Sequence, residues 1–229
     1  FSMVIASLFT QNFKTEWVMV TGGVVMVVMR FLIIFNHEKK WTPSLAIRRG
    51  LGLLPEDRKL QGLTQVLSVA FNTTSANIRR LIDRFFINLI MEKDLVAEHI
   101  DQLKIATPTQ DTLVRFLSGG NQQKVVIAKW LMTDPEIILL NDPTRGIDVG
   151  TKQEIYKLIR ELADKGKSIL LYSSDYAELI GCCDRVAVMY GGEIVAKLEG
   201  DAITEEAIVA ASLNVGTRAE APVAGAAHV

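Results

Sequence analysis

The sequence predicts an α/β fold in which a mostly parallel sheet is flanked by helices. Residues 137–140 are all apolar and are bounded by turn-forming residues, a pattern typical of a buried parallel strand. Residues 168–173 have the pattern of a second buried strand, and the helical segment 151–164 between the two ends near Gly166. This alternation of strand and helix is the arrangement of βαβ units, whose strands pair in parallel.

Composition places the chain among globular proteins. It has 229 residues, of which 49% are hydrophobic and 22% charged, enough to bury a core as one domain. The net charge of -1 gives no electrostatic reason to expect nucleic acid or acidic lipid as a partner. The two cysteines, Cys182 and Cys183, are adjacent, so we expect two reduced, buried thiols rather than a disulfide or a metal site. The chain starts at Phe1 and not at methionine, which fits a fragment of a longer protein.

A serine and two glycines precede the long apolar helical run 125–132. Ser118 is a good N-cap residue for this helix, because its side chain can accept a hydrogen bond from an otherwise unpaired backbone amide. Gly119 and Gly120 leave the backbone bare, so an anion could approach the N–H groups at the positive end of the helix dipole. The stretch therefore predicts a phosphate-recognition corner, although an ordinary capped helix is the alternative for a bare Ser-Gly-Gly.

A polar segment follows the apolar strand 137–140. Asn141 and Asp142 come directly after the strand, and Asp148 precedes the next helix. Ligands of α/β sheets bind outside the carboxyl ends of the strands, so these side chains are candidates for a site. Asp148 also has the position of an N-cap for the helix that begins at Val149, and the two roles are compatible.

The stretch LSGGNQQKVVIAKWLMTDPEIILLNDPTRGIDVGTKQEIY resembles the signature motif, Walker B strand and D-loop of ABC-transporter ATPases. It is most similar to the second half of the duplicated ATP-binding protein of carbohydrate importers of the ribose, xylose and galactose type. The resemblance extends over about 40–215 and includes PEDRK at 55–59 and YSSDYAEL at 172–179. It implies a P-loop NTPase-like ABC ATPase domain at 37–215, with a small α-helical lobe at about 72–133.

The resemblance also implies roles for individual residues, with ATP and Mg²⁺ as cofactors. Asn141 stands at the magnesium aspartate, Asp142 at the catalytic glutamate and Ser174 at the switch histidine, so three positions depart from the family pattern. In an alternative register Asp142 is the magnesium aspartate and no catalytic carboxylate remains. Glu56 takes the Q-loop glutamine position, and Asp148 is the D-loop aspartate. The residues implied to bind ATP are Leu117, Ser118, Gly119, Gly120, Asn121, Gln122, Glu56 and Asp148.

The phosphate-binding loop of the family is missing from the sequence. No G-x-x-x-x-G-K-[ST] pattern occurs anywhere in the chain, and residues 1–36, where the loop is expected, form an atypical apolar segment. Within it, residues 17–35 favour two strands around a glycine turn over a membrane-spanning helix. The segment is therefore either a degenerate loop or an altered terminus.

These departures suggest how the chain would work. In the family, two ATPase halves face each other, and each ATP site joins the Walker motifs of one half to the signature of the other. We expect this half to build a poor site of its own and to lend its signature to a partner half. The resemblance further implies a permease, indirectly a sugar-binding protein, no nucleic acid, and a peripheral position on the cytoplasmic face of the cell membrane. The alternatives are a silent pseudo-domain with an interaction role only, a non-transport ABC ATPase, and a protein anchored through residues 17–35.

The rest of the chain gives further predictions of secondary structure. Helical periodicity runs through 72–104, with an apolar stripe that we expect to lie mostly in the core and a second helix from about residue 93. Gly191 and Gly192 separate two strand-like segments and predict a hairpin. The remaining predictions are helices at 41–50, 175–181 and 204–213, a strand at 51–54, and a disordered tail at 216–229.

Overall fold

The computed structural model describes residues 3–8, 42–83 and 86–213. A six-stranded sheet runs through the molecule in the order β2-β5-β6-β1-β7-β8. Strands β2, β5 and β6 pair in parallel, whereas β1 is antiparallel to both β6 and β7, and β7 is antiparallel to β8. The strands span Met3–Leu8 (β1), Leu51–Leu54 (β2), Ile137–Asn141 (β5), Ser168–Tyr172 (β6), Arg185–Tyr190 (β7) and Glu193–Glu199 (β8).

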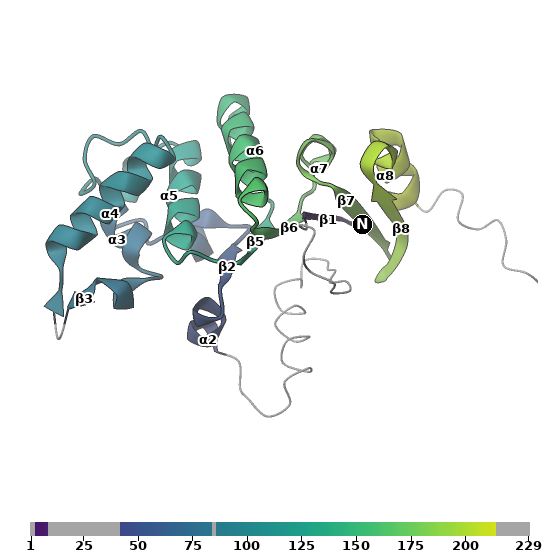
Figure 1. Cartoon of the computed structure of the whole chain (residues 1–229). Helices are drawn as coiled ribbons and strands as arrows, with labels where there is room; N and C mark the ends of the chain where they lie inside the picture. Colours follow the sequence, from purple (N-terminus) through teal and green to yellow (C-terminus); the bar gives the residue numbers. More distant parts are fainter. Residues whose placement is uncertain (1–2, 9–41, 84–85, 214–229) are drawn as a thin grey trace, which may run out of the picture.

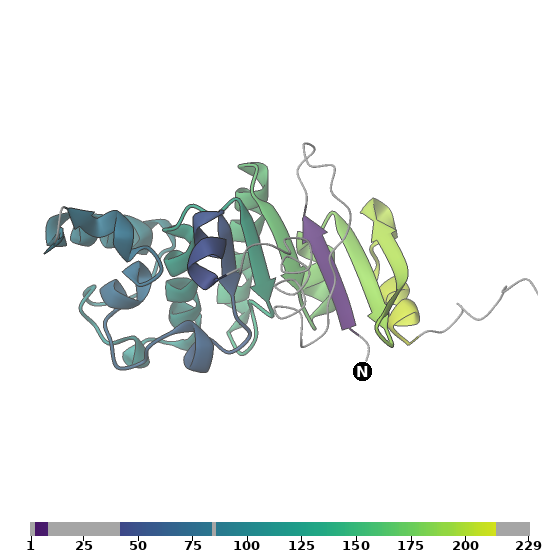
Figure 2. The same ribbon diagram turned by 90° about the horizontal axis from the view of Figure 1, so that it is seen from below.

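Helices cover one face of this sheet. Figure 1 shows α5, α6, α7 and α8 above the strands, and the view from below in Figure 2 shows α2 in front of the strands on the opposite side. Buried side chains of α5 and α6 form the core together with side chains of β5, β6 and β7. The helices span Pro43–Arg48 (α2), Val69–Thr74 (α3), Leu89–Gln102 (α4), Gly119–Leu131 (α5), Val149–Asp164 (α6), Tyr176–Cys182 (α7) and Glu205–Ser212 (α8).

The parallel strands are confirmed, but their burial is one-sided. In β5 only Ile138 and Leu140 are fully buried, while Ile137 keeps 39% of its surface exposed. Alternate residues of a strand point to opposite faces, so the helix-covered face is the dry one. Strand β1, whose backbone pairs between β6 and β7, is not among the strands that the sequence predicts.

The helices α3 and α4 lie with α5 at the end of the sheet beyond β2 (Figure 1). The predicted continuous helix from residue 72 is wrong, because the chain breaks after α3 into a 3₁₀ turn (η2, Ile78–Leu81) and a small hairpin of β3 (Ile82–Asp83) and β4 (Phe86–Ile87). Hydroxyl groups explain the stop: Thr73 donates to the Val69 carbonyl at 2.8 Å, and the next two residues bond back in the same way.

The apolar stripe predicted as core in this region is mostly at the surface. Leu81 is buried, but Ile82 is 46% exposed, Phe86 80% and Ile90 76%. These side chains recur at helical spacing, yet no described element packs over them.

The carboxyl-terminal half follows the predictions closely. The hairpin forms between β7 and β8 with Gly191 and Gly192 at its turn, both with positive φ. Helices α2, α6, α7 and α8 lie within two residues of their predicted bounds. Cys182 and Cys183 are buried free thiols, as expected, and burial raises the pKa of Cys182 to about 12.

Some predictions fall outside the described residues. The apolar segment 17–35 and the tail 216–229 are among them. Within the part of the chain that the structure describes, no helix is both long and apolar enough to span a bilayer.

Candidate functional site

The entrance of α5 is built as predicted. Ser118 is exposed and caps the helix, since its Oγ accepts hydrogen bonds from the backbone N of Asn121 at 3.4 Å and from its Nδ2 at 2.9 Å. The Asn121 Oδ1 in turn accepts from the Ala106 amide at 2.8 Å, which ties the cap to the preceding loop. Leu117 is buried beneath it. The cap is therefore held rigidly while its outer face stays open.

The two glycines lie close to side chains of neighbouring segments. A Cβ on Gly119 would lie 2.8 Å from Nη2 of Arg58, and a Cβ on Gly120 would lie 2.6 Å from Oγ1 of Thr151. Gly120 is buried, and Gly119 is partly exposed. Gly119 is therefore the glycine whose backbone faces outward, and Gly120 allows α5 to approach α6.

Gln122 is turned away from the open face. It is buried, and its Nε2 donates to the carbonyls of Val114 and Leu117, each at 3.2 Å. The side chain braces the loop that leads into α5. Its neighbour Gln123 donates to the Pro143 carbonyl at 2.6 Å and so connects α5 to the segment after β5.

The end of β5 brings Asp142 and Ser174 together. Asp142 has a left-handed φ of 44°, which is uncommon for a residue with a side chain, and is 8% exposed. Its Oδ1 accepts hydrogen bonds from the backbone N of Ser174 at 2.8 Å and from its Oγ at 3.1 Å. One carboxylate oxygen is thus already saturated by the residue at the switch position.

Asn141 offers a single neutral ligand atom. Its Oδ1 is buried and has no hydrogen-bond partner among the described residues. In the described chain no group of three or more acidic, histidine or cysteine side chains gathers around a common point. Because Mg²⁺ in phosphate-binding sites is held through one or two carboxylates plus phosphate oxygens, the neutral Asn141 and the partly engaged Asp142 would make a weak magnesium site.

Glu56 and Asp148 both lie in loops near the α5 entrance. Glu56 forms an ion pair with Arg145. Asp148 caps α6, accepting from the backbone N and the Oγ1 of Thr151, each at 2.9 Å. These bonds hold the pKa of Asp148 below its ordinary value.

Sequence reasoning missed a buried polar cluster behind Asp142. Glu178 has no exposed surface, and burial raises its pKa to about 7. The Ser173 hydroxyl donates a hydrogen bond to its Oε2, and the buried side chain of Thr144 lies beside both Glu178 and Tyr156. One signal was available: Glu178 shares the buried face of α7 with Leu179 and Cys182, so a carboxyl group stands inside an apolar pattern.

Comparison with known proteins agrees with this architecture. A profile of the family described as ABC transporter matches residues 32–145. The chain is 53% identical over 176 residues to the ribose import ATP-binding protein RbsA 1 of Mesorhizobium japonicum, covering 76% of this chain and 34% of that protein. It is 55% identical over 181 residues to the protein of the same name in Rhizobium etli, covering 79% and 34%. The chain thus spans about a third of the length of these relatives.

Solved structures of ATP-binding cassettes have the same fold. The dimeric cassette MJ0796 in a post-hydrolysis state, bound to ADP and Pi, has a TM-score of 0.62 at 19% identity, covering 86% of this chain and 98% of that one. A nucleotide-free cassette from an ABC transporter has a TM-score of 0.61 at 18% identity, with 91% and 96% covered. The chain is thus similar in sequence to ribose import ATP-binding proteins and to the ABC transporter family profile, and it has the fold of ATP-binding cassettes.

Proposed function

We propose that this chain is the second ATPase half of a carbohydrate importer and that it lends the entrance of α5 to an ATP site completed by another ATPase half. The observation that carries the proposal is the rigid cap at Ser118, which leaves partly exposed Gly119 at the positive end of a 13-residue helix. Phosphate is the ligand chemistry that this arrangement suits. The partner half would supply the phosphate-binding loop that this sequence lacks.

The nucleotide position on this chain itself supports the division of labour. Asn141 is uncharged, and one carboxylate oxygen of Asp142 already accepts two hydrogen bonds from Ser174. Both features weaken a site for Mg²⁺-ATP, because a hard dication prefers free carboxylate oxygens. Leu117, Asn121 and Gln122 then support the entrance, while Glu56 and Asp148 hold the loops beside it.

The substrate and the membrane partner follow from the relatives. Both bacterial proteins compared above are named for ribose import, so we propose a sugar, with ribose the first to test. Import requires a permease, and a sugar-binding protein would deliver the substrate to it. The chain would then sit peripherally on the cytoplasmic face of the membrane.

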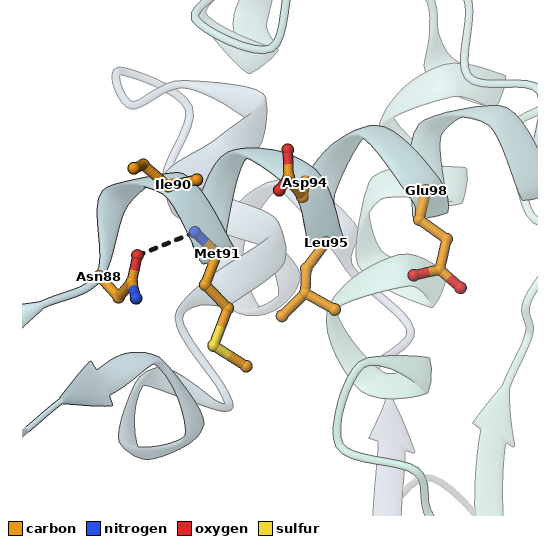
Figure 3. A pocket seen from close by; sticks show the side chains of 6 residues that line it. All are labelled: Asn88, Ile90, Met91, Asp94, Leu95 and Glu98. Carbon is orange, nitrogen blue, oxygen red and sulfur yellow. Dashed lines mark hydrogen bonds between the residues drawn. The ribbon is translucent and has the colours of Figure 1, made fainter.

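The helical end of the molecule has a surface suited to a permease. Figure 3 shows a hollow along α4, with a volume of about 430 Å³. Ile90 and Phe86 nearby are among the most exposed large apolar side chains of the described residues. An exposed apolar patch of this kind marks a protein contact. The hollow is lined by Asn88, Ile90, Met91, Asp94, Leu95 and Glu98.

A charge placed at the helix entrance tests the proposal without breaking the helix. Aspartate is as good an N-cap as serine, so Ser118→Asp keeps the cap but sets a negative charge where the phosphate would lie. In the full-length protein assembled with its permease, we expect ATPase activity to fall at least about tenfold, the effect of about 1.4 kcal/mol of repulsion. The matched control is Thr204→Asp, which sets the same negative charge at the N-cap of α8.

Asn141→Ala is the complementary variant. We expect it to leave ATPase activity within about twofold of the parent. The nucleotide site that contains Asn141 is proposed not to hydrolyse ATP, so a change there should not limit the measured rate. The reverse pattern, full activity in Ser118→Asp and loss in Asn141→Ala, would show that this chain hydrolyses ATP at its own site and not through its signature.

A further inference from the structure

Arg58 connects two loops that are far apart in the sequence. Its Nη1 donates to the Arg145 carbonyl at 2.9 Å and its Nη2 to the Gly146 carbonyl at 3.2 Å. Two successive carbonyls are thus held by one planar guanidinium, a geometry that a lysine amine cannot reproduce. The ion pair between Glu56 and Arg145 adds a third contact between the same two loops.

The loop that carries Arg58 is itself fixed to α5. Asp57 caps the short π-helix η1 (Arg58–Gly62) by accepting from the two amides after Arg58. At the other end of η1, Lys129 of α5 donates to the Gly62 carbonyl, and Gly62 packs against Val126. Arg58 therefore extends from a segment anchored on α5 to the middle of the 142–148 loop.

The guanidinium also occupies the place that a side chain at residue 119 would take. The Nη2 that holds the Gly146 carbonyl lies 2.8 Å from the position of a Cβ on Gly119, and the Gly146 carbonyl oxygen lies 3.4 Å from it. Gly119 needs no positive φ, so its backbone alone does not demand glycine. A side chain at this position would therefore have to move the Arg58 guanidinium away from the carbonyls that it holds.

We propose that Arg58 is a positioning residue that sets the 142–148 loop against the entrance of α5, and that a side chain at residue 119 would displace the guanidinium and so release this loop. The loop carries Asp142 at one end and Asp148 at the other, so its placement fixes both relative to Ser118. The functional part of this inference rests on the proposed ATPase role, whereas the structural part does not.

Amide hydrogen exchange on this chain tests the structural part without nucleotide. The Arg145 amide donates to the Asp142 carbonyl at 3.1 Å, and the Thr151 amide donates to the Asp148 carboxylate. Arg58→Ala should make both exchange about threefold to tenfold faster, the effect of losing one or two hydrogen bonds. Gly119→Ala should do the same, because its methyl group displaces the guanidinium. Arg58→Lys, with one donor nitrogen in place of two, should restore part of the protection.

The double variant shows whether Arg58→Ala and Gly119→Ala speed amide exchange through the same contact or through separate ones. If Gly119→Ala acts through Arg58, the pair Arg58→Ala and Gly119→Ala exchanges no faster than either single variant. Lys59→Ala, an exposed neighbour in the same loop, and Gly181→Ala, which meets no atom within 4 Å, should leave the exchange unchanged. Additive effects in the double variant, or unchanged exchange in Arg58→Ala, would overturn the proposal.

The functional part is tested by measuring ATP hydrolysis by the full-length protein assembled with its permease. Arg58→Ala should lower kcat about tenfold while KM for ATP stays within about twofold, because a misplaced loop affects turnover and not binding. A raised KM with unchanged kcat would instead make Arg58 a nucleotide contact and overturn its positioning role. If the parent complex hydrolyses no ATP, the proposed function fails, and the exchange measurements still decide the structural part.

Discussion

Replacing Glu178 by glutamine should remove a specific pH dependence of stability. Glu178 is fully buried, and its pKa is raised from 4.5 to about 7 by burial. The folded chain therefore binds a proton that the unfolded chain has released, and the free energy of unfolding falls as pH rises from 4.5 to about 7. At about 1.4 kcal/mol per pH unit, the decrease from this one group is roughly 3 kcal/mol.

Glutamine stays neutral across this range and keeps the shape of the protonated acid, so the variant should lack the decrease. Urea denaturation of parent and variant at pH 4.5 to 8 measures it: the variant should gain about 3 kcal/mol on the parent between the two ends. The aspartates with lowered pKa values, Asp134, Asp148 and Asp175, titrate below this window. Glu161→Gln, an exposed change in α6, is the control. Parallel curves for Glu178→Gln and the parent would refute the reasoning.

Three further variants follow from the geometry. Gly120→Ala sets a methyl group against Thr151, and we expect a loss of about 1–3 kcal/mol in urea denaturation, partly recovered by Thr151→Ala; an unchanged midpoint would show that α5 and α6 are free to separate. Lys124→Met removes an amine that donates to the Lys104 carbonyl at 3.0 Å and forms an ion pair with Glu154 at 2.6 Å. We expect the free energy of unfolding to fall by about 1–2 kcal/mol in urea denaturation. An equal fall in Glu154→Gln alone would assign the effect to the ion pair. Ile90→Asp changes a side chain that is 76% exposed, so the thermal midpoint should stay unchanged while co-purification with the permease weakens. Undiminished co-purification would show that the permease binds another surface.

Local patterns predicted most of the secondary structure. The hairpin at Gly191 and Gly192 and the caps at Ser118 and Asp148 depend on residues within a few positions of one another, and all of them formed. Helical spacing gave a wrong prediction where no described element covers the apolar stripe, because periodicity records the positions of apolar residues and not what covers them. Ile82, Phe86 and Ile90 are the result: they are spaced like a core stripe but lie at the surface.

The site was predictable only in part, because local patterns do not show which distant residues the fold brings together. The sequence placed Asp142 and Ser174 together through a family pattern, and the structure joins them by two hydrogen bonds. Arg58 was out of reach, because its partners lie 87 and 88 residues further along the chain. Glu178 was missed because a carboxyl group is ordinarily assigned to the surface, and only the fold brings Ser173 and Thr144 around it.

The two native thiols make the chain convenient for spectroscopy. Cys182 and Cys183 are the only cysteines in the sequence, both are buried, and burial raises the pKa of each, so neither presents a reactive thiolate at neutral pH. A cysteine introduced at Val149, which is 74% exposed beside the cap of α6, would then take up a maleimide dye alone. The distance between this dye and a second dye on a facing half could follow their approach during turnover, with no native residue of this chain removed first.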